Sequence, residues 1–239
     1  MNTNTSLDGQ GIFVSFEGGE GVGKSTQIRL LAARLRECGY EVLTLREPGG
    51  TEIGERIREI LLDPAHSDLD PTSELLLYEA ARAQLVSTVI LPALQRGVVV
   101  LCDRFTDSTR AYQGAARDLG ETMVRKINDL ATGGLVPHRT IILMRDVETA
   151  LRKASEDGTD RIEAEGIDFH TRVQEAFLRI ASEEPNRVRV IRCEFVKRTT
   201  AERVFAEVRD LFTRAQDVSY EITDDLLKQV KREKRNDGC

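Results

Sequence analysis

Residues 18–25 have the types and the spacing that bind phosphate groups. They read Gly-Gly-Glu-Gly-Val-Gly-Lys-Ser and fit the pattern G-x-x-x-x-G-K-[ST]. In such a loop the glycines let backbone N–H groups converge on phosphate oxygens, and the lysine reaches the outer phosphates. The serine hydroxyl is a ligand for Mg²⁺. The sequence therefore predicts a nucleoside triphosphate site with Mg²⁺, formed by Gly18, Gly19, Glu20, Gly21, Val22, Gly23, Lys24, Ser25 and Thr26.

The segments on either side of this loop support that interpretation. The apolar residues 12–16 predict a buried strand before the loop, and residues 27–35 carry apolar side chains at helical spacing after it. An ordinary glycine-rich turn is the alternative, but it does not require a strand and a helix around it. Because the phosphate-binding motif does require that context, the flanks favour the motif.

Charged residues follow two further predicted strands. Asp103 and Arg104 come directly after an apolar run, and Arg46 follows the predicted strand 41–45. Asp103 is in the position of a second carboxylate for Mg²⁺, and the planar guanidinium of arginine suits phosphate. A helix cap beside a surface charge is the alternative for Asp103 and Arg104. Two arginines besides the loop lysine exceed what one triphosphate needs, which indicates a second phosphorylated substrate.

Strand-like and helix-like segments alternate along the chain. The alternation predicts βαβ units and a parallel sheet covered by helices on both faces, with the phosphate loop at its carboxyl edge. The predicted strands cover residues 12–17, 41–45, 97–102, 139–144 and 187–192. The predicted helices lie near residues 24–38, 52–62, 72–95, 121–132, 147–156, 168–183 and 200–214.

Composition limits the class of protein. The chain has 239 residues, a net charge of −6 and a hydrophobic fraction of 40%, which suits one domain over residues 11–214. A disordered leader is expected at 1–10, and a solvated, charged extension at 215–239. The negative charge argues against nonspecific nucleic-acid binding, and no apolar run approaches the roughly 20 residues of a membrane span. The absence of an export signal and of paired or zinc-spaced cysteines predicts a cytoplasmic protein.

Three segments carry a resemblance to a known family. They are Phe-Glu-Gly-Gly-Glu-Gly-Val-Gly-Lys-Ser-Thr at 16–26, Arg-Glu-Pro-Gly-Gly-Thr at 46–51 and Asp-Arg-Phe-Thr-Asp-Ser-Thr-Arg-Ala-Tyr-Gln-Gly at 103–114. Over residues 11–214 the chain resembles the bacterial type of the thymidylate kinase family. The members of this family are P-loop nucleoside monophosphate kinases. The resemblance implies a three-layer αβα fold with a five-stranded parallel sheet and a short lid. It also implies a homodimeric enzyme that transfers the γ-phosphoryl group of ATP to dTMP with Mg²⁺.

The resemblance extends to site residues. Arg46 and Arg104 would hold the dTMP phosphate, Tyr78 would stack on thymine, and Arg82 would donate to an exocyclic oxygen of the base. Tyr112 would pack against the sugar and disfavour a 2′-hydroxyl; core packing is the alternative for both tyrosines. The implied dTMP contacts are Glu20, Arg46, Pro48, Tyr78, Arg82, Arg104, Ser108, Thr109, Tyr112 and Gln113, and the implied catalytic residues are Lys24, Arg46, Arg104, Arg152 and Arg161.

The lid, about residues 152–163, departs from the family. Ser155 and Asp157 stand where arginines are expected, and Met144 stands where the family commonly has aspartate. Arg152, Lys153 and Arg161 remain as candidate lid cations, although Arg161 could instead pair with Asp160 or Glu163. Two alternatives to an active dTMP kinase follow. One is a degenerate homologue that binds nucleotides with little transfer, and the other is a P-loop kinase for another nucleoside monophosphate or a deoxynucleoside.

Overall fold

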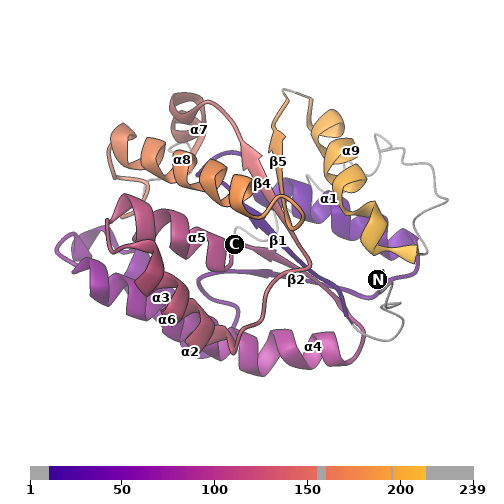
Figure 1. Cartoon of the computed structure of the whole chain (residues 1–239), viewed down its shortest axis with the longest axis horizontal. Coiled ribbons are helices and arrows are strands. Elements are labelled where there is room, and N and C mark those ends of the chain that lie inside the picture. Colours follow the sequence, from indigo (N-terminus) through magenta and orange to yellow (C-terminus); the bar gives the residue numbers. More distant parts are fainter. Residues whose placement is uncertain (1–10, 155–159, 195, 214–239) are drawn as a thin grey trace.

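The computed structural model describes residues 11–154, 160–194 and 196–213. Within these residues the chain forms a parallel sheet with helices on both faces, which confirms the predicted α/β fold (Figure 1). None of the helices in these ranges is long and apolar enough to cross a membrane. The predictions for the leader 1–10, for the extension 215–239 and for the lid residues Ser155 and Asp157 lie outside the described residues.

The sheet of the described residues has five strands in the order β2-β3-β1-β4-β5, and all neighbouring pairs are parallel. Every residue of the central strand β1 is buried, as its apolar sequence predicts. Because all strands run in the same direction, their carboxyl ends share one edge. The strands are β1 (Phe13–Glu17), β2 (Val42–Arg46), β3 (Val99–Asp103), β4 (Arg139–Met144) and β5 (Val188–Arg192), and they match the predicted strands to within two residues.

The helices follow the strands in the predicted alternation. The α-helices are α1 (Lys24–Glu37), α2 (Glu52–Leu62), α3 (Pro71–Leu85), α4 (Leu91–Gln95), α5 (Thr106–Thr109), α6 (Glu121–Thr132), α7 (Val147–Ala154), α8 (Ile167–Glu183) and α9 (Lys197–Val208). Within the described ranges, π-helical turns cover Val86–Ile90 and Arg110–Ala116, and 3₁₀ turns cover Pro64–His66 and Arg209–Leu211.

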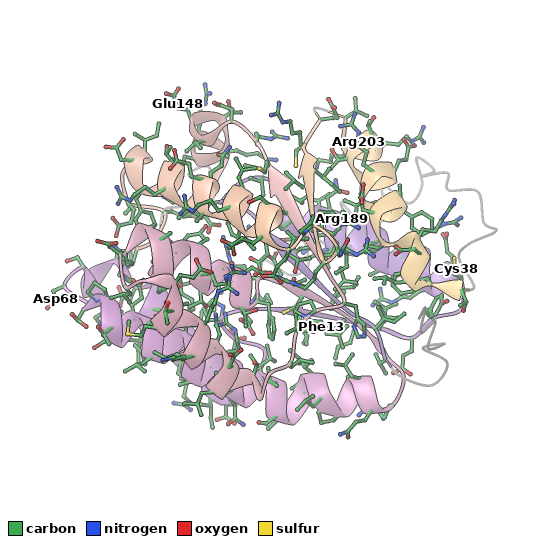
Figure 2. The ribbon with its side chains drawn as sticks, viewed as in Figure 1. Phe13, Cys38, Asp68, Glu148, Arg189 and Arg203 are labelled. Carbon is green, nitrogen blue, oxygen red and sulfur yellow. The ribbon has the colours of Figure 1, made fainter. Side chains whose placement is uncertain are left out.

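Hydrophobic side chains on both faces of the sheet hold the helices in place. Leu31 of α1 and Phe205 of α9 belong to one core cluster, which covers the face that carries Phe16. On the opposite face, Phe13 packs edge-on against Phe105 with ring centroids 4.8 Å apart. Figure 2 shows Phe13 in the interior of the molecule. Helix α8 covers the same face nearer to β4, where Phe177 joins a second cluster.

Two helical segments differ from the prediction. The single helix predicted over 72–95 consists of α3, a π-helical turn and α4. The change occurs next to Pro92, which has no backbone N–H to donate and so interrupts the regular hydrogen-bond pattern. Helix α5 and the π-helical turn Arg110–Ala116 were not predicted, because their sequence Thr-Asp-Ser-Thr-Arg-Ala-Tyr-Gln-Gly-Ala-Ala lacks an apolar repeat at helical spacing.

Candidate active site

A cavity of about 750 Å³ opens at the carboxyl edge of the sheet. This volume lies within the range of nucleotide-sized ligand pockets. Residues from the phosphate loop, β2, α3, β3 and the Arg110–Ala116 turn surround it. The predicted site residues that line it are Glu20, Gly21, Gly23, Lys24, Ser25, Thr26, Arg46, Pro48, Tyr78, Arg82, Asp103, Arg104, Ser108, Thr109, Tyr112 and Gln113. The fold therefore brings together most of the residues that the sequence singled out.

The phosphate loop needs its glycines because neighbouring backbone lies against it. Gly18 and Gly21 have positive φ angles of 127° and 66°. A Cβ atom on Gly18 would lie 2.2 Å from the carbonyl oxygen of Leu143, and one on Gly21 would lie 2.0 Å from that of Ala150. Both distances are too short for any side chain. The end of β4 and helix α7 thus fix the shape of the loop.

Lys24 and Ser25 begin α1 beside the carboxylate at the end of β3. The Lys24 ammonium donates to the carbonyl oxygens of Gly18 and Gly19 at 3.3 and 2.9 Å. Burial, and next the charge of Arg104, lower the pKa of Lys24. The Ser25 hydroxyl donates to Asp103 Oδ2 at 3.0 Å. The two residues predicted to hold Mg²⁺ therefore lie next to each other.

Arg104 is fixed in the cavity by several contacts. Its backbone has a positive φ of 72°, which is unusual for a residue other than glycine. The guanidinium pairs with Glu20, donates to Gly18 O at 3.1 Å and lies 5.0 Å from the ring centroid of Tyr112. It also donates to the hydroxyl oxygens of Ser108 at 3.1 Å and Tyr112 at 3.2 Å. A side chain held this firmly needs little reorganisation to meet an anion.

Glu17, at the end of β1, was not predicted as a site residue from the sequence. Glu17 is fully buried at the end of β1, where its carboxyl accepts from Phe105 N at 2.8 Å and contacts Ser108 Oγ at 2.5 Å. Burial, and next the charge of Asp107, raise the pKa of Glu17 to about 8. Its place directly before the phosphate loop could have marked it, but an acid at the end of an apolar strand is not by itself a signal of burial.

This raised pKa predicts a pH dependence of stability. The folded state holds the Glu17 proton up to about pH 8, while the unfolded chain loses it near 4.5, so the free energy of unfolding should fall as pH rises through this window. One such group contributes a slope of about 1.4 kcal/mol per pH unit. Chemical unfolding at pH 6, 7 and 8 measures this change. The free energy of unfolding should fall less steeply with pH for Glu17→Gln, which cannot ionise, than for the wild type. Exposed Glu59→Gln is the control, and equal slopes in all three proteins would contradict the prediction.

Arg46 lies across the cavity beside a second arginine. Arg46 pairs with Glu55 at 2.7 Å and donates to Pro48 O at 2.9 Å. Arg58, which the sequence analysis missed, donates to the same carbonyl oxygen at 3.0 Å and also lines the cavity. Arg58 was missed because it lies in the middle of α2, away from any motif. This wall of the cavity therefore carries two positive charges where one was expected.

Arg82 lies at the cavity within a buried ion network, and its donation to the base stays a prediction. Its guanidinium is 2% exposed and pairs with the buried carboxylates of Glu47 and Glu79. Nη1, which faces Glu79, is also within hydrogen-bond distance of Thr109 Oγ1 at 2.7 Å and Asn128 Oδ1 at 3.0 Å, and Nη2 donates to Phe105 O at 3.1 Å. All its donors have protein acceptors, because a buried guanidinium is stable only when it is fully paired. Arg82 therefore borders the cavity as part of a buried ion network.

Tyr78 and Tyr112, the two tyrosines predicted to contact dTMP, both border the cavity, and Tyr112 also packs in the core. Tyr78 of α3 is half-buried, and burial raises its pKa. The Tyr112 ring makes edge contacts with Phe169 and Phe177, with centroids 6.1 and 6.4 Å apart. Tyr112 thus has a packing role as well as a place at the cavity. Gln113, which follows it, is buried and donates to Glu74 at 2.7 Å.

The lid arginines do not lie among the residues that line the cavity. Arg152 is exposed near the end of α7. Arg161 is buried: it pairs with Glu74 at 2.6 Å and donates to Leu61 O at 2.8 Å. Its partner is therefore Glu74, and neither Asp160 nor Glu163. In this structure Arg161 does not line the cavity, because it pairs with Glu74, and its role at the phosphates stays a prediction.

A phosphate loop between β1 and α1, with an acidic residue at the end of the adjacent strand β3, defines a P-loop protein of the class that binds nucleoside triphosphates. The chain belongs to the thymidylate kinase family, because the family model described as thymidylate kinase matches residues 16–204. This confirms the resemblance found in the sequence.

Individual relatives agree with this assignment. The chain is 49% identical over 183 residues to a thymidylate kinase of Deinococcus radiodurans, a match that covers 76% of this chain and 88% of the relative. It is 52% identical over 178 residues to one of Synechococcus sp., covering 74% and 84%. A crystal structure of thymidylate kinase from Ehrlichia chaffeensis superimposes with a TM-score of 0.69 at 33% identity, covering 84% of this chain and 99% of that structure.

Proposed function

We propose that this chain transfers the γ-phosphoryl group of ATP to dTMP and gives dTDP. The observation that supports this most directly is the shared cavity, in which the phosphate-loop residue Lys24 faces the same space as Arg46, Arg104 and Tyr78. One part of the cavity suits a triphosphate, and the other offers two arginines and an aromatic ring to a second nucleotide. Its relatives in the thymidylate kinase family support dTMP as that nucleotide.

Ser25 and Asp103 fit a Mg²⁺ ion. A hydroxyl and a carboxylate oxygen are the hard ligands that Mg²⁺ prefers, and the Ser25 Oγ to Asp103 Oδ2 distance of 3.0 Å keeps both at one point. Among the described residues no cluster of three or more His, Cys, Asp or Glu side chains could hold a metal. This suits an ion that takes its other ligands from water and from substrate phosphates. When bound, Mg²⁺ would neutralise charge on the transferred phosphoryl group.

The protein residues act mainly by alignment and by neutralising charge. Lys24 would contact the outer phosphates of ATP, while Arg104 and Arg46 would hold the dTMP phosphate opposite. No general base is required, since the accepting oxygen of dTMP is already an anion. The contacts of Arg104 with Glu20 and Tyr112 fix its guanidinium before substrate arrives. Two anionic substrates that repel each other are thereby held in line for transfer.

The other contacts with dTMP, the phosphoryl acceptor, are also proposals. Tyr78 would stack on thymine, and Pro48, Ser108, Thr109 and Gln113 would border the nucleotide. In this arrangement Arg82 supports the base site indirectly, because it donates to Thr109 Oγ1 at 2.7 Å. Tyr112 would close the sugar site.

A coupled assay of ADP release tests the proposed function. Wild-type protein with Mg²⁺ and ATP should turn over dTMP at a higher kcat/KM than dUMP, dCMP or dGMP. Binding of ATP and dTMP without turnover would instead support a degenerate homologue, and a preference for another acceptor would support a different kinase. The intact set of Lys24, Ser25, Asp103 and Arg104 in one cavity favours the active enzyme.

We further propose a cytoplasmic homodimer. Three apolar side chains of the adjacent helices α2 and α3 are exposed: Ile53 by 53%, Ile60 by 42% and Leu76 by 54%. Burying them against a second copy would remove apolar surface from water. Sedimentation velocity would give the mass in solution, and a monomer at micromolar concentration would contradict the dimer.

A further inference from the structure

The strand order divides the cavity into two sides. The phosphate loop follows the central strand β1, and Arg46 and Arg104 come from the ends of β2 and β3 on one side of it. Strands β4 and β5 lie on the other side and lead towards α7 and α9. The proposed function places dTMP, the phosphoryl acceptor, on the β2–β3 side. In-line transfer then places the part of ATP beyond its γ-phosphate over β4 and β5.

Two lysines enter the cavity from this second side. Lys153 lies near the end of α7, and Lys197 is the first residue of α9. Both line the same cavity as Lys24 and Ser25, although α7 and α9 follow different strands. Neither lysine belongs to the phosphate-loop motif.

Helices α7 and α9 are each attached to the phosphate-binding segment. A Cβ atom on Gly21 would lie only 2.0 Å from the carbonyl oxygen of Ala150 and 3.1 Å from the Ala154 nitrogen, so the last turn of α7 rests on the loop. Gln27, in the first turn of α1, donates to the backbone oxygen of Lys197 at 3.3 Å. The start of α9 is therefore tied to the helix that carries Lys24 and Ser25.

The electrostatics of Cys193 show that positive charges gather here. Cys193 lies between β5 and α9, where burial raises the pKa of its thiol. The charges of Arg145, Lys153 and Lys24 oppose this rise. Arg145, which directly follows β4, therefore acts together with cations of α7 and α1 on one point after β5. In contrast, Arg161 is held by Glu74 and does not line the cavity.

We propose that Lys197, with Lys153, holds the phosphates of the donor nucleotide from the β4–β5 side, an inference that rests on the proposed function. The lid residues Ser155, Glu156 and Asp157 carry no positive charge. The two lysines would supply positive charge from the helix ends on either side of the donor. Lys197 distinguishes this proposal from a contact made by the lid alone, since it lies after β5 and outside the lid.

The test compares Lys197→Ala, Lys153→Ala, the double variant and Lys197→Arg. Steady-state kinetics with ATP and dTMP and calorimetric titration with MgATP alone are measured for each. Lys197→Ala should raise the KM for ATP and the Kd for MgATP about tenfold, the scale of losing one charged hydrogen bond. The KM for dTMP should stay within about twofold of wild type if the contact is to the donor alone. Lys197→Arg should recover most of the ATP affinity, because it keeps the charge.

Lys126→Ala is the matched control, since Lys126 is exposed on α6 and does not line the cavity. An unchanged Kd for MgATP in Lys197→Ala and in the double variant would overturn the proposal, as would a rise in the KM for dTMP alone. A Lys197→Arg variant as weak as Lys197→Ala would also overturn it, because a phosphate contact tolerates either cation. If wild type fails to phosphorylate dTMP, the proposed function fails, but the MgATP titration still decides the role of Lys197.

Discussion

Replacing Lys24 with alanine should reduce dTMP phosphorylation by at least about 100-fold, the effect of removing one preorganised charge-stabilising donor. The Lys24 ammonium is held 2.9 Å from Gly19 O and faces the cavity beside Ser25. From this position it would contact the outer phosphates of ATP, where negative charge shifts during transfer. Steady-state kinetics at saturating dTMP should show the loss mainly in kcat, because a contact that strengthens in the transition state affects kcat most.

The same substitution should leave the fold nearly unchanged. Lys24 is buried at the cavity, and burial lowers its pKa, which means that the folded protein gains little from this charge. The melting temperature of Lys24→Ala should therefore lie within a few degrees of wild type. Exposed Lys126→Ala is the control for the loss of one lysine. Near-normal turnover in a folded Lys24→Ala protein would remove the phosphate loop from the mechanism.

Features encoded by neighbouring residues were predicted well from the sequence. The strands depend on short apolar runs, and the phosphate loop depends on its glycines; both patterns can be read in the sequence. Strand β1 and the loop at residues 18–25 follow the prediction. The cavity was predictable for the same reason, because the ends of parallel strands must meet at one edge. The Ser25–Asp103 contact is an example, since it joins the start of α1 to the end of β3, and both segments were predicted.

Buried charge pairs between residues that are distant in the sequence were not predicted. Arg161 was predicted to be a lid cation, but its partner Glu74 lies on α3, and no local pattern links them. The buried acid Glu17 is similar, because its contacts are Ser108 of α5 and Phe105 directly before it, and α5 lacks an apolar repeat. Charged side chains of this kind are recognised only when the fold shows which charges it buries together.

Arg82 gives the second large effect, this time on stability. Arg82→Ala should lower the free energy of unfolding by about 3–5 kcal/mol, because it leaves buried carboxylates without their cation. Glu47 and Glu79 are both almost fully buried, and Arg82 pairs with each of them. Urea unfolding at pH 7 measures the change. Arg56→Ala is the matched control: Arg56 pairs with Glu52 at 3.5 Å on the exposed face of α2, where a pair is worth only about 0–1 kcal/mol.

The pH dependence separates lost charge pairing from lost packing. Burial already raises the pKa of Glu47 to about 7 while Arg82 opposes the rise, so removing Arg82 should raise that pKa further. Protonation of Glu47 then removes the unpaired charge. The difference in the free energy of unfolding between wild type and Arg82→Ala should therefore become smaller from pH 8 to pH 5. Adding Glu47→Gln and Glu79→Gln to Arg82→Ala should restore part of the stability at pH 8. A gap that is the same at every pH, with no recovery in the triple variant, would mean that Arg82 stabilises the protein by packing alone.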